Sequence, residues 1–456
     1  MIEAKIPFHF DSREYQRPFI RAVDDSIKGR SKVRNFMQIW HRRAGKDKVD
    51  IADCIPRRLI QDPCLVKMVY PTLKMGRENL WDGIGGDGFR YLNHIPEGIR
   101  IGKPNETSMK INVATKNHEE SIFQIGGSDN PDSLRGGNPK MFVFSEWSEQ
   151  DPYAWDVVEP ILKENGGISI FNLTPRGDNH ARALHDYAKD SPLWHVEVLT
   201  AEQTGIWTLK QLDEIQLDII KRFAANGRSE SEAIAYFQQE YMCSFETPVI
   251  GSYYGAALRL AEKEGRITDV PVAEGYPVDT AWDLGMDDSM TIWFFQQIGA
   301  TYRFVDYYEN SGEGLQFYAK ILQSKQYLYG KHYAPHDVAV RELGTGKSRL
   351  EAAKQLGITF EVAPRLDVDD GINAVRSMFR QFWFDKDKTY RGVNCLRNYR
   401  KDWDEKNKVF RTKARHDWAS HGADAMRVFA TGHRAYVKPT VQSSFGGVKP
   451  FFEGIG

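Results

Sequence analysis

Short apolar runs alternate with helix-like segments along much of the chain, and this alternation restricts the possible fold more than any other feature. Between Asn35 and about Ser244 the apolar runs are FMQIW, CLVKMVY, SIFQIGG, MFVFSEW, GISIFNL and WHVEVLT. Strand-sized apolar runs separated by helices are typical of an α/β domain whose sheet is mainly parallel. We therefore predict a first domain of this class, with a helical subregion over about 205–245.

A second series of strands begins after a charged passage that contains turns. Its runs are PVDTAWD, TIWFFQQIG, TYRFVDYYE, KHYAPHD and ITFEVAP, with helical stretches between the later ones. Three strands in succession, followed by alternating helix and strand, predict an α/β domain with a mixed sheet. The predicted organisation is a first domain over 1–245, a linker over 246–275, a second domain over 276–435 and a flexible tail over 436–456.

The charge balance and the cysteines exclude several classes of protein. Lys and Arg total 61 against 62 for Asp and Glu, so any surface for nucleic acid must be local. The four cysteines form no CxxC pair, which argues against a zinc finger and against a disulfide framework. No stretch approaches the roughly 18 apolar residues of a membrane span. We expect a protein of the cytoplasm without a membrane partner.

Two Gly-Lys pairs compete for a phosphate-binding role. HRRAGKDK at 41–48 lacks the first Gly and the final hydroxyl of the G-x-x-x-x-G-K-[ST] pattern, whereas LGTGKSRL at 343–350 keeps the hydroxyl. Context favours the first pair, because backbone N–H groups cradle phosphates where a buried strand enters a loop and a helix follows. FMQIW supplies that strand and KDKVDIADCIPRRL supplies the helix, so we predict that Gly45 and Lys46 bind phosphates.

The apolar strand MFVFSEW runs directly into Ser145 and Glu146. A carboxylate at the C-terminal end of a parallel strand beside a phosphate-binding loop can orient and activate the water that attacks a γ-phosphate. Glu146 is therefore the candidate catalytic base.

With the next strand, the order of motifs resembles the large terminase subunits of tailed bacteriophages, the motors that pump DNA into capsids. Members have an RRxGK loop, a YPT segment, an LRG segment, a strand that ends in an acidic pair and a Thr-Pro coupling motif. The corresponding residues here are Arg42-Arg43-Ala44-Gly45-Lys46, Tyr70-Pro71-Thr72, Leu134-Arg135-Gly136, Ser145-Glu146 and Thr174-Pro175-Arg176-Gly177. The resemblance covers residues from about 10 to 430, and it implies a P-loop ATPase domain followed by a ribonuclease H-like nuclease domain.

The resemblance also implies ATP and Mg²⁺ as ligands of the first domain, with the loop and Thr174 around the nucleotide. The chain departs from the family at Ser145, where an Asp usually helps to hold Mg²⁺, and at Asp47, where Thr or Ser is usual. Asp47 could supply an oxygen ligand in their place.

Two further residues have family roles that compete with simpler interpretations. Gln16 lies in a segment that resembles the adenine-contacting part of these motors, where a Gln amide can pair with N6–H and N7 of adenine; a capping or surface glutamine is the alternative. Arg135 lies in the Gly-flanked loop DSLRGGNP, and the family implies an arginine finger that reaches the γ-phosphate of a neighbouring subunit. A solvated arginine in a turn is the other interpretation.

Acidic residues end two strands of the second domain and recur on a late helix. Asp283 ends PVDTAWD, Asp337 follows the strand HYAP, and Asp424 lies in HDWASHGADAMRVFA. Such carboxylates are what two Mg²⁺ or Mn²⁺ ions about 4 Å apart need in order to activate water and neutralise a scissile phosphate. This matches the family's nuclease domain, so we predict that these three residues are its catalytic metal ligands.

The late helix offers a second carboxylate, Asp417. On a helix that runs through 417 the two acids would be about 10 Å apart along the axis, so two ions are not expected to engage both. Asp424 is favoured because small residues, Ala423 and Ala425, flank it and because it matches the family's Ser-His-x-Ala-Asp-Ala segment. Asp417 and His421 are then expected to support the ligands or to contact phosphate.

The segment from 376 to 415 carries 13 Lys or Arg against 5 Asp or Glu, interleaved with aromatic residues. It has two interpretations, a surface for the DNA backbone or a pair of amphipathic helices with an aromatic core and a solvated face. In the nuclease interpretation, Lys347 and Arg349 of the second Gly-Lys segment contact DNA.

Together these observations predict a motor in which ATP hydrolysis drives double-stranded DNA into a procapsid while the C-terminal domain cleaves concatemers. The resemblance implies a portal protein and a small terminase subunit as partners, and a homo-oligomeric ring, a pentamer by the family pattern. It places the chain in the host cytoplasm, transiently docked on the procapsid and not a stable part of the virion. The alternatives are a helicase-nuclease enzyme, whose helicase motifs we do not find, and a degenerate scaffold that only binds DNA.

Overall fold

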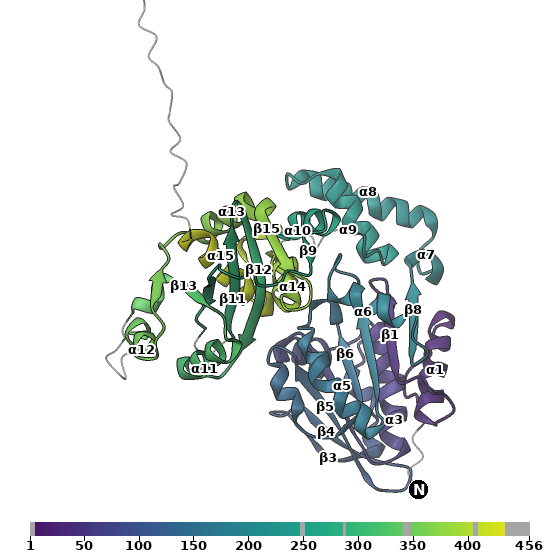
Figure 1. Ribbon diagram of the computed structural model, residues 1–456. Coiled ribbons are helices and arrows are strands. Elements are labelled where there is room, and N and C mark those ends of the chain that lie inside the picture. Colours follow the sequence, from purple (N-terminus) through teal and green to yellow (C-terminus); the bar gives the residue numbers. More distant parts are fainter. Residues whose placement is uncertain (1–4, 247–250, 286–288, 341–347, 405–408, 434–456) are drawn as a thin grey trace, which may run out of the picture. The chain divides into compact units, whose positions relative to one another are not determined.

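A computed structural model of the chain describes residues 5–246, 251–285, 289–340, 348–404 and 409–433 (Figure 1). The chain divides into two compact units. The first is Met1–Lys263 with Arg391–Ser420, and the second is Glu264–Tyr390 with His421–Gly456. This division differs from the contiguous domains expected from the sequence, because 391–420 packs with the first unit. The segment expected to be a linker contains α10 (Gly255–Lys263) and β9 (Ile267–Thr268).

In the described residues, the main sheet of the first unit has eight strands in the order β3-β4-β5-β2-β6-β7-β1-β8. Neighbours from β5 to β8 are parallel, whereas β4 is antiparallel to both β3 and β5. The strands are β1 (Asn35–Trp40), β2 (Leu65–Tyr70), β3 (Arg100–Asn105), β4 (Lys110–Ala114), β5 (Glu120–Gly127), β6 (Pro139–Ser145), β7 (Ile168–Leu173) and β8 (Trp194–Leu199). The predicted α/β class with a mainly parallel sheet is confirmed.

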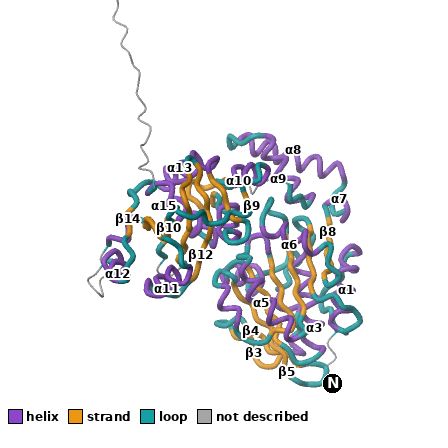
Figure 2. Tube along the Cα trace, viewed as in Figure 1, coloured by secondary structure: helices purple, strands orange, loops and turns teal. Residues whose placement is uncertain are grey.

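Helices cover both faces of this sheet, as Figure 2 shows. Successive residues of β1 enter different cores: Phe36 packs with α1 and α3 on one face, and Met37 packs with α5 and α6 on the other. The helix pair α8 and α9 has a small core of its own. The helices are α1 (Arg17–Ile27), α2 (Lys46–Val49), α3 (Ile55–Gln61), α4 (Leu73–Gly76), α5 (Tyr153–Asn165), α6 (His180–Ala188), α7 (Ala201–Thr204), α8 (Leu209–Ala225), α9 (Glu230–Met242) and α14 (Tyr390–Asn398).

The second unit contains a mixed sheet in the order β14-β13-β10-β11-β12-β15-β9. Strands β10, β11 and β12 form an antiparallel meander, and β13 and β14 continue from β10 in parallel. This arrangement confirms the expected α/β domain with a mixed sheet. With β9, its strands are β10 (Val278–Asp283), β11 (Met290–Ile298), β12 (Thr301–Asn310), β13 (Tyr329–Ala334), β14 (Phe360–Val362) and β15 (Phe382–Asp385). The separate hairpin of β16 (Lys401–Asp404) and β17 (Val409–Ala414) belongs to the first unit.

Helix α15 (Trp418–Gly432) packs closely on the mixed sheet; the other helices here are α11 (Leu315–Lys325), α12 (Arg349–Gln355) and α13 (Val368–Met378). Trp293 Nε1 donates to the Gly422 carbonyl over 2.8 Å, and Ala423 and Ala425 are fully buried. Small residues allow this approach, which places Asp424 beside the sheet. Across the described ranges, none of the helices combines the length and the apolar character needed to span a membrane.

Candidate nucleotide and metal sites

The loop between β1 and α2 has the backbone expected of a phosphate-binding loop. A helix begins at Lys46 and continues without a break through a π-helical segment, Asp50–Cys54, into α3. Arg43 (φ 73°) and Gly45 (φ 84°) adopt the left-handed conformation, which helps to turn successive N–H groups toward one anion. A Cβ at position 45 would also lie 3.1 Å from Gln16 Nε2, so both the backbone and the available space favour glycine.

Gln16 fixes the position of this loop. Its buried amide donates from Nε2 to the Ala44 carbonyl over 2.9 Å and accepts at Oε1 from Arg13 N over 3.0 Å. Tyr15 donates its hydroxyl to the same Ala44 carbonyl. An adenine would have to replace both bonds of the Gln16 amide, so the contact with adenine stays a prediction.

Lys46 and Thr174, predicted from separate motifs, are in contact. The Lys46 side chain is buried, and Nζ donates to Thr174 Oγ1 over 2.8 Å and to the Trp40 carbonyl over 3.1 Å. Both residues line a cavity of about 820 Å³ together with Arg42, Arg43 and Glu146. A cavity with a buried lysine at the start of a helix is suited to a polyphosphate.

Asp47 lies among neutral hydrogen-bond donors. Its Oδ1 accepts from Ser145 Oγ over 2.7 Å and from Asn172 Nδ2 over 2.8 Å, and its Oδ2 accepts from Tyr70 Oη over 3.0 Å. Among the described residues, no Lys or Arg forms an ion pair with this carboxylate. An oxygen anion held by neutral groups is a donor that fits Mg²⁺. Burial, and then the charge of Asp47, raises the pKa of the neighbouring Asp50 well above its usual value.

Glu146 occupies a strained position directly after β6. It adopts φ 56°, and its N–H donates to Asn172 Oδ1 over 3.1 Å. Burial raises the pKa of its carboxyl group, and Oε2 has no hydrogen-bond partner among the described residues. A buried acceptor without a partner, in a cavity that also holds Lys46, has the properties of a catalytic base.

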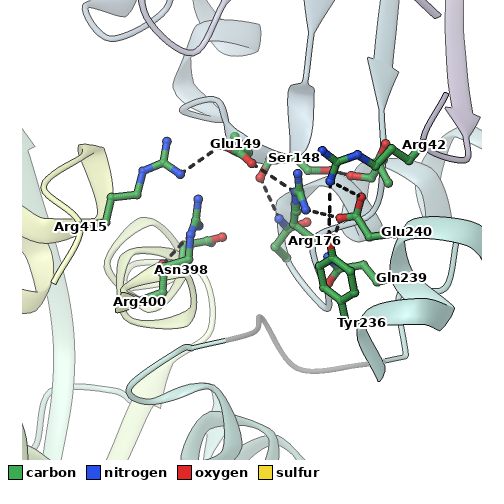
Figure 3. A network of polar contacts seen from close by, with 12 residues as sticks. Arg42, Ser148, Glu149, Arg176, Tyr236, Gln239, Glu240, Asn398, Arg400 and Arg415 are labelled. Atoms are coloured by element: carbon green, nitrogen blue, oxygen red, sulfur yellow. Dashed lines mark hydrogen bonds and ion pairs between the residues drawn. The ribbon is translucent and has the colours of Figure 1, made fainter. Parts of the chain in front are cut away.

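A chain of ion pairs lines the same cavity (Figure 3). Arg176 Nη1 contacts Glu240 of α9, and its Nε lies 3.1 Å from Glu149 Oε1. Arg42 Nη1 lies 3.5 Å from Glu240, and Arg415 Nη1 lies 3.0 Å from Glu149. Burial opposes the ionisation of Glu149, but Arg176 and Arg415 more than offset it and hold its pKa well below the usual value. The Thr-Pro-Arg-Gly segment is thereby connected to the helical subregion.

In the second unit, two of the three predicted metal ligands interact electrostatically. Asp283 ends β10 and Asp424 lies on α15; burial, and then the charge of Asp283, raises the pKa of Asp424. Arg427 Nη2 pairs with Asp424 Oδ1 over 2.6 Å, and His421 Nδ1 lies 3.5 Å from Asp283 Oδ2. Adjacent carboxylates fit a divalent cation, because it would relieve their repulsion.

The third predicted ligand, Asp337, is exposed on the 3₁₀ turn His336–Ala339. This turn follows β13, and β13 is parallel to β10, so Asp337 follows the same edge of the sheet at which Asp283 lies. Among the described residues, no three His, Cys, Asp or Glu side chains are grouped closely enough to hold a metal, and 286–288 lie outside them. The three-carboxylate site stays a prediction.

Asp417 stands immediately before α15 and not on it. Its Oδ1 accepts from the N–H of Ala419 over 3.0 Å, and its Oδ2 lies 3.2 Å from Arg415 Nε. The carboxylate therefore has the contacts of a helix cap.

The second Gly-Lys segment lies mostly outside the described residues, which include neither Gly346 nor Lys347. Ser348 is the N-cap of α12 and forms a capping box with Glu351. Arg349 Nη1 donates to the Leu284 carbonyl over 2.9 Å. The Ser348 hydroxyl thus has a structural partner, and the DNA contacts proposed for Lys347 and Arg349 stay predictions.

Part of the cationic segment 376–415 is used inside the protein. Phe382 and Tyr399 are buried, which agrees with an aromatic core. Three of its arginines pair with acids of the first unit: Arg391 with Asp151, Arg397 with Glu262 and Arg415 with Glu149. Arg380 and Lys388 are exposed, and a role for these cations in binding DNA stays a prediction.

Comparison with known proteins agrees with these features. No model of a known protein family matches the chain. Over 385 residues the chain is 22% identical to the large terminase subunit of Escherichia phage T5, an alignment that covers 81% of this chain and 80% of the phage protein. The chain is thus similar to a large terminase subunit along most of its length.

Solved terminase structures are also among the matches. The large terminase of a thermophilic bacteriophage, in complex with ADP, is 15% identical and covers 90% of this chain and 98% of its own, with a TM-score of 0.39. The manganese-bound nuclease domain of the large terminase of bacteriophage SPP1 is 19% identical and covers 36% and 89%, with a TM-score of 0.29.

The arginine that the terminase pattern marks as a finger lies outside the cavity of its own chain. Arg135 is exposed on the 3₁₀ turn Pro131–Arg135, where its guanidinium pairs with Asp132 and donates to the Tyr153 hydroxyl. It is not among the residues that line the cavity. An action on a neighbouring subunit stays a prediction.

Asn172 is a residue of the candidate site that the sequence interpretation missed. It is fully buried on β7, opposite Ser145 in the register, and it binds Asp47, Asp50 and the N–H of Glu146. The signal in the sequence was a polar residue inside the apolar run ISIFNL, because a buried amide needs partners.

Proposed function

We propose that the chain is a DNA-packaging motor with its own endonuclease: ATP hydrolysis in the first unit moves double-stranded DNA, and the second unit cleaves it. The observation that carries this proposal is the single cavity that contains Lys46, Thr174 and Glu146. These three residues come from three separate motifs, and the similarity to the phage T5 subunit extends over both units.

In the ATP step, Lys46 Nζ leaves Thr174 and neutralises the charge of the terminal phosphates. Glu146 accepts the proton of the attacking water at Oε2. Mg²⁺, for which the donors around Asp47 fit, supplies further charge neutralisation of the phosphates when bound. The loop 42–47 holds the phosphates through its N–H groups.

Loss of the hydrogen bond between Lys46 and Thr174 on nucleotide binding would transmit a structural change to the rest of the unit. Thr174 begins the segment that carries Arg176, and Arg176 contacts Glu240 on α9. A change at Thr174 therefore reaches the helical subregion in few contacts. We assign this path to the coupling of hydrolysis with DNA movement.

In the nuclease step, Asp283, Asp337 and Asp424 would hold Mg²⁺, or Mn²⁺ in its place, and the metal would supply water activation and charge neutralisation. Double-stranded DNA is the substrate. The remaining partners are a portal protein, a small terminase subunit and further copies of this chain in a ring, a pentamer by the family pattern. The proposed location is the host cytoplasm, on the procapsid during packaging.

The test is ATP hydrolysis by the full-length chain with double-stranded DNA, with single-stranded DNA and without DNA. Stimulation by the duplex supports the motor. Stimulation by single strands together with strand separation would indicate a helicase-nuclease instead. DNA binding without any ATP turnover would indicate a scaffold.

A further inference from the structure

The two departures from the usual P-loop pattern are reciprocal. In P-loop NTPases the Ser or Thr after the loop lysine and an acid at the end of the Walker-B strand hold Mg²⁺. Here the residue after Lys46 is an acid, Asp47, and the residue that ends β6 is a hydroxyl, Ser145. The chain therefore keeps one hydroxyl and one carboxylate but has them at each other's positions.

The geometry shows that the two positions meet. Ser145 Oγ donates to Asp47 Oδ1 over 2.7 Å, so carboxylate and hydroxyl face the same point although β6 and α2 are separate elements. Asn172 donates to the same Oδ1 over 2.8 Å from β7, which lies between β6 and β1 in the sheet. An exchange of the two side chains thus preserves the chemical groups at that point.

The environment of Asp47 leaves the carboxylate able to take a cation. A carboxylate has about four acceptor positions, and the described residues supply three hydrogen bonds, all from neutral groups. The adjacent ammonium group is directed elsewhere, because Lys46 Nζ donates to Thr174 and Trp40. Tyr70 and Asn172 fix the carboxylate in place without neutralising it.

We propose that Asp47 and Ser145 are a compensated exchange, in which Asp47 supplies the carboxylate, and Ser145 the hydroxyl, to the divalent cation that accompanies ATP. The inference rests on the proposed ATP-binding role of the loop and goes beyond it, because it assigns the metal-binding acid to the loop. The two positions are then interdependent: restoring the usual residue at only one of them should weaken Mg²⁺-dependent nucleotide binding or ATP turnover.

The experiment uses the full chain and compares Asp47→Thr, Ser145→Asp and the double variant. The readout is the affinity for fluorescent ADP with Mg²⁺ and with EDTA, together with thermal melting and ATP turnover. We expect Mg²⁺ to tighten binding in the wild type. Asp47→Thr should lose about 10- to 100-fold of that tightening. Ser145→Asp should slow ATP turnover, because it places two carboxylates side by side. The double variant should recover both the Mg²⁺-dependent tightening and the rate of turnover.

The control is Asp62→Thr, the same substitution beyond the far end of the helix, where the carboxylate pairs with Arg58. It should leave the Mg²⁺ effect unchanged. If Asp47→Thr keeps the full Mg²⁺ effect, or if a folded double variant is no better than Asp47→Thr, the exchange is refuted while ATP binding stands. If the wild type binds no nucleotide, both the exchange and the proposed function are refuted.

Discussion

Replacement of Arg176 by Gln should destabilise the first unit strongly, because it leaves one buried and one partly buried carboxylate with fewer partners. The Glu240 side chain is 1% exposed and that of Glu149 is 16% exposed. Removal of one partner from a buried ion pair costs about 3–5 kcal/mol. Arg42 and Arg415 remain near these acids, so we expect the lower end, about 3 kcal/mol. At roughly 2 °C per kcal/mol for a unit of this size, the melting temperature should fall by about 6 °C.

The assay is thermal and urea unfolding of Arg176→Gln, Glu240→Gln and the double variant. The double variant should be less destabilised than the sum of the singles, with a coupling of roughly 1–3 kcal/mol. Arg222→Gln serves as the control, because Arg222 forms an exposed pair with Asp218 that should contribute less than about 1 kcal/mol. Additive single effects, or an Arg176→Gln variant as stable as the control, would refute the network as a structural support.

The pH dependence of this deficit has a definite sign. The folded pKa of Glu149 is lowered, so its ionised form stabilises the fold above the unfolded value of about 4.3, and this contribution is lost as the pH falls below it. The difference in stability between wild type and Arg176→Gln should therefore narrow below that pH. A difference that widens in acid would contradict the assigned charges.

Three further predictions concern activity. Glu146→Gln should reduce ATP turnover by about 10²–10⁴-fold while nucleotide binding persists, and equal turnover in the variant would exclude Glu146 as the base. Because burial raises the Glu146 pKa, wild-type turnover should begin to fall on acidification at a pH above the pKa of an ordinary glutamate. Arg135→Ala should bind ATP and hydrolyse it roughly 10³-fold more slowly. Mixed rings of Arg135→Ala and Glu146→Gln should recover part of the ATP turnover. If hetero-oligomers form and recover no turnover, action of Arg135 in trans is excluded. Alanine at each of the three predicted nuclease ligands should abolish Mn²⁺-dependent cleavage and spare ATP turnover, whereas Asp417→Ala should only weaken cleavage; a manganese-soaked crystal with the metal on Asp417 would reverse that order.

The strands of both sheets were predictable because each buried strand is a compact apolar run between turns. The hairpin β3–β4 was not, because β3 is largely exposed and its residues, RIGKPN, carry no apolar alternation. Strand β9 has only two residues, and β15, although Phe382 and Phe384 are buried, has only four and lies between helices. Local patterns describe strands that pack on a core and miss strands that are short or at an edge.

The loop, Lys46, Thr174 and Glu146 were found because each ends or follows a recognisable strand. The contact of Lys46 with Thr174, and the bonds of Asn172 to Asp47 and to the N–H of Glu146, depend on strand order, which the sequence does not display. The bonds of Gln16 to the loop and the pairing of Arg415 with Glu149 join residues distant in the chain. Partners of this kind follow from tertiary packing, which local patterns cannot specify.

The central claim is that the strand, loop and helix around Gly45–Lys46 form the ATP site, and ATP turnover by Lys46→Ala and Lys347→Ala tests it most directly. Lys46→Ala removes the ammonium group that lies in the cavity and should abolish turnover, while Lys347→Ala should leave it largely intact. Both variants should melt as cooperatively as the wild type. Retained turnover in Lys46→Ala together with its loss in Lys347→Ala would contradict the account.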